Sequence, residues 1–180
     1  MRQTLREIVE RSYPNGRHDE PEERLIEAHS MALDDLRTLL REIAGHTPCE
    51  VFVNADRNYS VSYEVHFAHP SDKAVWGAGR QPDQPRYVTI VRISRLGPVY
   101  HTAWNRVLLH DGRSVAEYID RAPPELAAFE RGLETAITAR GLEQLTDEEF
   151  DEPVPWLSPG TATVSGPPIT IAQCLFSAEL

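Results

Sequence analysis

The clearest pattern in the chain is a strict alternation of apolar and polar residues. In the run Tyr59-Ser60-Val61-Ser62-Tyr63-Glu64-Val65-His66-Phe67, every odd-numbered residue is apolar and every even-numbered residue is polar. Successive side chains of a β-strand point to opposite faces, so this run predicts a strand with one buried and one exposed face. The exposed face is expected to carry Ser60, Ser62, Glu64 and His66.

Three further segments complete a predicted sheet. Cys49, Val51 and Val53 alternate with the polar Glu50 and Asn54, and the turn-forming residues 54–58 predict a hairpin to the first strand. Residues 86–94 and 99–109 are rich in Val, Ile, Thr, Tyr and Trp and are joined by a tight connection. The segment 68–85, with three prolines and two glycines, predicts a long loop. The sequence therefore predicts a four-stranded antiparallel meander.

Helical spacing of apolar residues predicts helices on both sides of this sheet in sequence. The helices expected before it span residues 5–11, opened by a capping box at 4–7, and residues 19–45. After it we expect a short helix opened by a capping box at 114–117, a helix from about 123 to 140 that stops at Gly141, and single turns at the capping boxes 146–149 and 170–173.

This order of elements predicts an α+β fold: N-terminal helices, the four-stranded meander, and C-terminal helices packed on one face of the sheet. The chain has 180 residues and a mass of 20.3 kDa, which predicts a single globular domain over 1–180. No apolar run is long enough to cross a bilayer and the N-terminal residues are charged, so we expect a cytoplasmic protein. Cys49 and Cys174 are expected to be buried thiols.

The charge of the chain is negative and unevenly distributed. Residues 1–48 hold seven basic and ten acidic side chains, 49–110 hold seven and five, and 111–180 hold four and thirteen, so the net charges are −3, +2 and −9. The total of −10 opposes binding to nucleic acid or to an anionic membrane. It favours a basic partner, although a solvated acidic face that maintains solubility is an alternative interpretation.

Motifs for catalysis and for metal binding are missing from the sequence. Neither a phosphate-binding glycine loop nor a G-x-S-x-G nucleophile motif occurs. His66 and His69 have H-x-x-H spacing, but on a strand this spacing places the two rings on opposite faces. We therefore predict no catalytic residue, no metal site and no cofactor.

The acidic run near the C-terminus is the strongest candidate for a binding surface. Five acids surround one aromatic residue, and a second aromatic residue follows; the predicted partner-binding residues are Asp147, Glu148, Glu149, Phe150, Asp151, Glu152 and Trp156. An aromatic anchor within a charged rim is typical of protein-binding hot spots.

Three phrases of the chain resemble a known class of proteins. They are SRLGPVYHTAW at 94–104, GLE at 141–143 continued by EPVPWL at 152–157, and TIAQCLF at 170–176. They are similar to segments of the immunity proteins encoded beside polymorphic toxins in GC-rich bacteria. The resemblance implies a protein that binds and blocks a cognate toxin, and it implies no particular set of contact residues.

The leading hypothesis is a non-catalytic inhibitor whose acidic C-terminal third covers the basic active site of a toxin. The main alternative is an enzyme or a protein that binds a small ligand or metal in a pocket between the exposed sheet face and the 68–85 loop. That pocket would use His66, His69, His101 or Trp76. A homodimer formed through the sheet is a third possibility.

Overall fold

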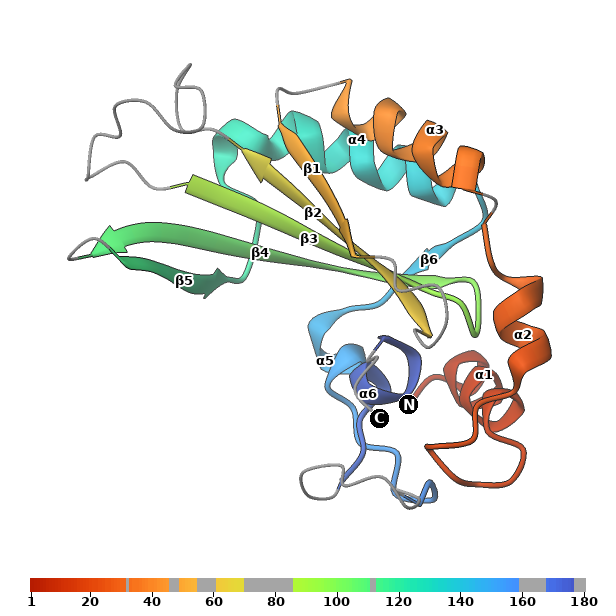
Figure 1. Cartoon of the computed structure of the whole chain (residues 1–180). Coiled ribbons are helices and arrows are strands. Elements are labelled where there is room, and N and C mark those ends of the chain that lie inside the picture. The colour runs from red at the N-terminus through yellow and green to blue at the C-terminus, as the bar shows by residue number, and fades with distance from the viewer. Residues whose placement is uncertain are drawn as a thin grey trace.

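An antiparallel sheet forms the centre of the computed structural model, which describes residues 1–31, 33–45, 49–54, 61–69, 86–110, 113–158 and 168–176 (Figure 1). Its strands follow one another in chain order and are β1 (Glu50–Asn54), β2 (Ser62–His69), β3 (Arg86–Ser94), β4 (Val99–His110) and β5 (Arg113–Ile119). A short strand, β6 (Glu143–Gln144), pairs in parallel with β4 at Val99 and Tyr100. The α+β class is confirmed.

The four predicted strands are present, and a fifth strand was missed. Residues 114–117 match a capping box, yet they lie in β5, which pairs with β4 from Trp104↔Ile119 to His110↔Arg113. The helix predicted there is wrong because the long β4 offers a free edge for a ladder, and this tertiary pairing outweighs a local capping signal. The sequence pair Asp111-Gly112, between the two strands, is favoured in tight hairpins. It was the signal in the sequence from which β5 could have been predicted.

The alternating pattern of β2 determines which residues it buries, as predicted. Tyr63, Val65 and Phe67 are buried in the core, whereas Glu64 and His66 are half-buried on the opposite face. Ser62 differs from the prediction because it is buried: its hydroxyl donates a hydrogen bond to the carbonyl oxygen of Phe176 at 2.8 Å. Ser60 and the predicted 54–58 turn beyond Asn54 lie outside the described residues.

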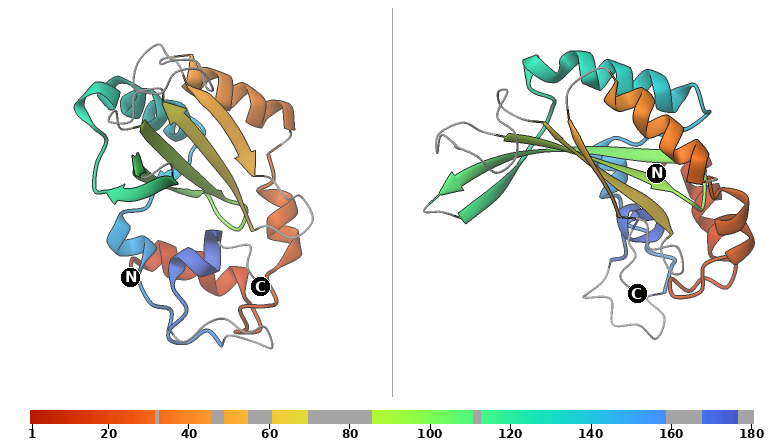
Figure 2. Two further views of the ribbon diagram at one scale, coloured as in Figure 1. Left: turned by 60° about the vertical axis from the view of Figure 1, so that its left-hand side comes forward. Right: turned by 45° about the horizontal axis from the view of Figure 1, so that its top comes forward.

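Two long helices cover one face of the sheet (Figures 1 and 2). They are α3 (Leu33–Ala44) and α4 (Ala127–Thr138), and a 3₁₀ turn at Pro124–Leu126 leads into α4. Their buried residues join the odd-numbered residues of β2 in one cluster, which includes Leu36, Leu39, Ile43, Phe129, Leu133 and Ile137. Gly141, with φ of 76°, follows the end of α4 and donates its N–H to the carbonyl of Thr138, as the predicted stop requires.

The remaining C-terminal helices lie against the opposite face. Helices α5 (Asp147–Phe150) and α6 (Ile171–Phe176) gather at one end of the sheet together with α1 (Gln3–Ser12) (Figure 2). They share a second apolar cluster, which includes Leu5, Val9, Ile171 and Leu175. The C-terminal helices therefore do not share one face, in contrast to the prediction, because the buried Ser62 end of β2 accommodates α6.

The helix predicted over 19–45 is divided into α2 (Glu23–Ala28) and α3. Ser30 lies between them: its hydroxyl bonds to the carbonyl of Ile26 and accepts hydrogen bonds from the guanidinium of Arg95. Arg95 follows β3, so a tertiary contact lies at the break between the two helices, and the local apolar spacing does not contain this contact. The capping box predicted at 4–7 is also wrong, since α1 begins at Gln3 and its N-cap, Arg2, makes no side-chain capping bond.

None of the described helices is long and apolar enough to span a bilayer.

Candidate partner-binding surface

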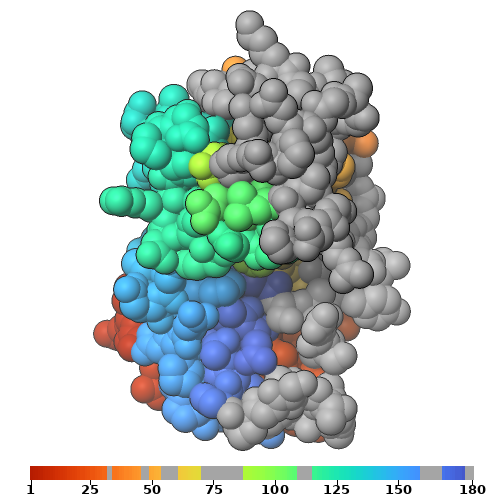
Figure 3. Space-filling model, turned by 90° about the vertical axis from the view of Figure 1, so that its left-hand side faces the viewer, coloured from red at the N-terminus to blue at the C-terminus, as the bar shows by residue number. Residues whose placement is uncertain are grey.

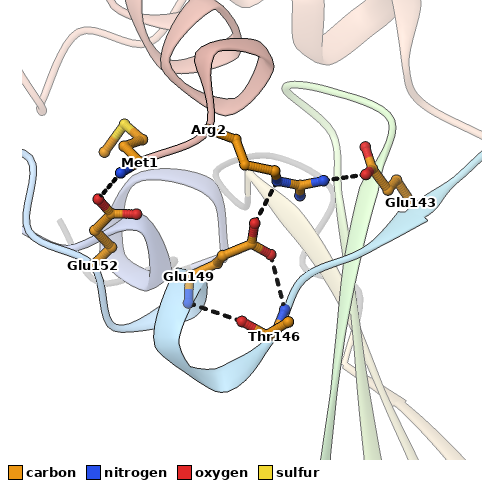
Figure 4. Close-up of polar contacts among 6 residues, drawn as sticks. All are labelled: Met1, Arg2, Glu143, Thr146, Glu149 and Glu152. Carbon is orange, nitrogen blue, oxygen red and sulfur yellow. Dashed lines mark hydrogen bonds and ion pairs between the residues drawn. The ribbon is translucent and has the colours of Figure 1, made fainter.

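Helix α5 carries the first four residues of the predicted acidic site, and a reciprocal cap forms it. The Glu149 N–H donates to the Thr146 hydroxyl at 3.2 Å, and the Thr146 N–H donates to the Glu149 carboxylate at 3.1 Å (Figure 4). These are the two bonds of a capping box, as the sequence predicted. The capping box at Thr170 and Gln173 is likewise present, at the start of α6.

The N-terminal residues neutralise two of the five predicted acids. Arg2 forms ion pairs with Glu149 and with Glu143 of β6, and the amino group of Met1 pairs with Glu152 (Figure 4). The side chains of Glu149 and Glu152 are 18% and 27% exposed, respectively. Both acids therefore hold α5 and its continuation in place, and each has a cation of the N-terminal residues beside it.

Asp147 is also bonded, but to groups that leave its charge uncompensated. Its carboxylate accepts hydrogen bonds from Nε2 of His101 at 2.8 Å and from the Tyr118 hydroxyl at 2.5 Å. Burial lowers the pKa of His101 although Asp147 opposes this shift, and the hydrogen bond to Asp147 raises the pKa of Tyr118 to about 12. Both partners are thus neutral near pH 7, whereas the Tyr118 bond lowers the pKa of Asp147 and keeps it ionised.

Glu148 and Asp151 are exposed, and neither forms an ion pair within the described part of the chain. Together with the half-exposed Asp147 they give α5 and its C-cap three uncompensated negative charges. The geometry therefore divides the five predicted acids into two that stabilise the fold and three that face solvent.

The two predicted aromatic anchors have different surroundings. Phe150 is half-buried. Its ring stacks on the His101 ring, with 3.8 Å between the two ring centroids, and its centroid lies 5.4 Å from that of Phe176. Trp156 is 39% exposed, and the guanidinium of Arg6 lies 4.8 Å from its ring centroid. Phe150 thus packs α5 against the sheet. Of the two predicted anchors, Trp156 is the one whose side chain is exposed to solvent.

Additional acids adjoin α5 that sequence reasoning missed. Asp120, which follows β5, and Glu130 of α4 line a cleft of about 250 Å³ together with Asp147 and Glu148. Figure 3 shows the face where β5 and the segment around α5 adjoin, in green and light blue. The excess of acids over 111–180 was the signal in the sequence for a negative surface. Only folding brings Asp120 and Glu130 next to Asp147 and Glu148.

The histidines of the alternative pocket do not converge. His66 and His101 share one face of the sheet, where Glu64 bonds His66 at 2.7 Å and Arg92 at 2.8 Å. His69 lies on the other face beside Phe129, bonded to the Thr89 hydroxyl, and burial lowers its pKa to about 4. Trp76 and the loop beyond His69 lie outside the described residues. Within the described ranges, no three His, Cys, Asp or Glu side chains are grouped so that they could hold a metal ion.

The two cysteines are unpaired thiols in this structure. Cys174 is buried, and this burial raises its pKa to about 12. Cys49 is half-buried, and its pKa is also raised by burial. Neither environment favours a reactive thiolate.

Comparison of the chain with family models, with curated proteins and with solved structures finds no match.

Proposed function

We propose that this protein is a non-catalytic inhibitor that binds a basic protein through the acidic surface around α5. An immunity protein that masks the active site of a cognate toxin is the form of this function that the sequence resemblance implies. The supporting observation is that Asp147 and Glu148 of α5, together with Asp151 at its C-cap, keep uncompensated charges on one ordered segment.

The physical basis is competition for a positive cleft. A toxin that acts on nucleic acid must hold phosphates with basic side chains, and a cluster of carboxylates is attracted to the same side chains. The capping box, the Arg2 ion pairs and the Phe150 stacking order α5 before binding. A preordered surface loses less conformational entropy on association, which favours tight binding.

Charge reversal at two exposed acids tests this proposal. The Glu148→Lys/Asp151→Lys variant and a control, Glu23→Lys/Glu134→Lys, change the net charge equally, and the control sites are exposed residues of α2 and α4. Each tagged protein is incubated with lysate of the source organism at low and high salt, and captured proteins are identified by mass spectrometry.

We expect the natural protein and the control to capture one basic protein stoichiometrically at low salt, and the Glu148→Lys/Asp151→Lys variant to lose it. Circular dichroism confirms that each variant is folded. Equal capture by all three proteins, or no capture by any, would contradict the proposal.

A second candidate function rests on another cavity. A pocket of about 490 Å³ lies between the α2–α3 junction and the ends of β3 and β4. Its walls combine apolar Ile93 and Leu142 with the polar groups of His29, Asp35 and Arg140. An apolar cavity with a few polar groups is typical of small-ligand sites. A small molecule released from the purified protein on denaturation and detected by mass spectrometry would support this function.

A further inference from the structure

Strand β5 forms one edge of the sheet. It pairs with β4 on one side, and within the described ranges no strand pairs with its other side. The ladder of seven residue pairs, from Trp104↔Ile119 to His110↔Arg113, runs without a bulge. The outer edge of β5 therefore presents a regular row of backbone N–H and C=O groups, which is a template for pairing with a further strand.

The described fold covers neither face of β5. Residues 115–118 are all exposed, although successive side chains of a strand point to opposite faces. Val115 is 45% exposed and Tyr118 is 53% exposed. Strand β4 also continues past β3, since the last residue pair between these two strands is Arg86↔Val107 (Figure 1). The β4–β5 hairpin thus projects beyond β3.

This edge lacks the features that commonly prevent edge strands from pairing with another chain. Such features are a very short strand, a proline, a bulge or a lysine on the edge. Strand β5 has seven residues with no proline and no lysine, and its Glu117 is paired with Arg106 of the same chain at 2.7 Å. Residues 104–119 hold two basic and two acidic side chains, so the hairpin has no net charge that would keep two copies apart.

The sequence of β5 complements itself in one antiparallel register. With a two-fold axis at Val115, Val115 of one copy lies opposite Val115 of the other, and position 117, a glutamate, lies opposite position 113, an arginine. An axis at Ala116 would place Val115 opposite Glu117. An axis at Glu117 would place two glutamates opposite each other, which is unfavourable. Of these three registers, the one centred on Val115 matches apolar with apolar and opposite charges with each other.

The same register extends an apolar row that begins inside each copy. Val115 lies opposite Leu108 of β4, so the joined sheets would carry the row Leu108, Val115, Val115 and Leu108 on one face. Apolar side chains directly opposite on neighbouring strands stabilise a sheet. We propose that the protein forms a two-fold dimer by antiparallel pairing of β5 with β5 of a second copy, centred on Val115. This proposal does not depend on the inhibitor function.

Sedimentation velocity of the full chain over a range of concentrations tests the dimer. Five residue pairs, 113–117 of each copy, make a joint smaller than a standard protein interface, so dissociation should be measurable. The mean mass should rise from 20.3 kDa toward twice this value between about 5 and 500 µM. A monomer at every concentration would overturn the proposal, because the edge would then be covered by another segment or kept for another protein.

A lysine at the axis tests whether β5 is the joint. Val115→Lys places two like charges opposite each other and should raise the Kd of the dimer about tenfold or more. The control Val53→Lys makes the same substitution on β1, the other edge strand, where Val53 is 42% exposed. It should leave the Kd unchanged, and circular dichroism confirms that both variants are folded. Equal Kd values for the two variants would overturn the assignment to β5.

A cysteine at the axis tests the register without adding a charge. Directly opposite residues of antiparallel strands have Cβ atoms about 4.5–5.5 Å apart, close to the separation that a disulfide requires. With diamide as the oxidant, Val115→Cys should form a covalent dimer on non-reducing electrophoresis. Val53→Cys, which retains the same two native thiols, should not. Equal cross-linking of the two variants, or none with Val115→Cys, would overturn the register.

Discussion

At the scale of single residues, two buried histidines show how environment decides the role of a side chain. His69 and His101 are both 3% exposed, but they lie on opposite faces of the sheet. His69 bonds a neutral hydroxyl inside the core, whereas His101 donates to the carboxylate of Asp147 and supports the ring of Phe150. The first therefore stabilises packing, and the second positions the acidic surface.

The depressed pKa of His69 predicts a loss of stability in mild acid. Burial lowers its pKa from 6.5 to about 4, so between these values the unfolded state takes up a proton that the folded state refuses. The stability present above pH 6.5 should therefore decline toward pH 4, by about 3 kcal/mol in total from this residue. Urea unfolding at a series of pH values measures the decline.

A His69→Gln variant is the control for this pH dependence. It lacks the titrating ring, so the decline in its free energy of unfolding between pH 6.5 and 4.5 should be shallower than that of the natural protein. Identical slopes for the two proteins would contradict the assignment, whatever the difference in their stability at neutral pH.

At the scale of secondary structure, α5 is stable because of what surrounds it. A helix of four residues has no stability of its own, since nucleation is unfavourable. It is held by the capping box at one end, by Arg2 through Glu149, and by the stacking of Phe150 on His101. The acidic surface is therefore an ordered part of the fold and not a flexible charged segment.

Removal of the cap should destabilise this element measurably. Thr146→Ala eliminates the hydroxyl that accepts the Glu149 N–H, and loss of such a cap costs about 1 kcal/mol. The matched control is Thr135→Ala, at an exposed position in the last turn of α4, where alanine is a better helix former and no loss is expected. Thermal unfolding of both variants provides the comparison, and equal midpoints would show that the capping bonds do not contribute.

At the scale of the whole molecule, the charge is polarised along the chain as well as large. The net charge is −10, and 111–180 contributes −9 of it. Basic residues of the N-terminal segment neutralise part of that excess, through Arg2 on Glu143 and Glu149, but leave the solvent-facing acids of α5 uncompensated. The proposed partner, a protein with a positive cleft, would be attracted toward this side before it makes contact.

This polarity predicts a salt-dependent association rate. For the natural protein and the captured partner, the association rate constant should fall at least about tenfold as salt rises from about 0.05 to 0.5 M, because exposed charges are screened. The Glu148→Lys/Asp151→Lys variant should associate more slowly at low salt and depend less on salt. Stopped-flow or surface-based kinetics measure both constants, and an association rate independent of salt would be inconsistent with electrostatic steering.

Local patterns in the sequence determined much of this protein. The alternation over 59–67 specified the buried face of β2, and the spacing of Thr146 and Glu149 specified a capping box. The composition of 111–180 specified an acidic region. Each of these features depends on residues within a few positions of one another, so it can be read without knowledge of the fold.

Only the tertiary structure decided the remaining features. It made a strand of β5 by pairing it with β4, and it placed α4 and α6 on opposite faces of the sheet. It also decided which acids of the run are neutralised, since Arg2 reaches Glu149 across 147 positions and His101 reaches Asp147 across 46. Charge compensation and cleft formation depend on distance in space, and separation along the chain does not reveal that distance.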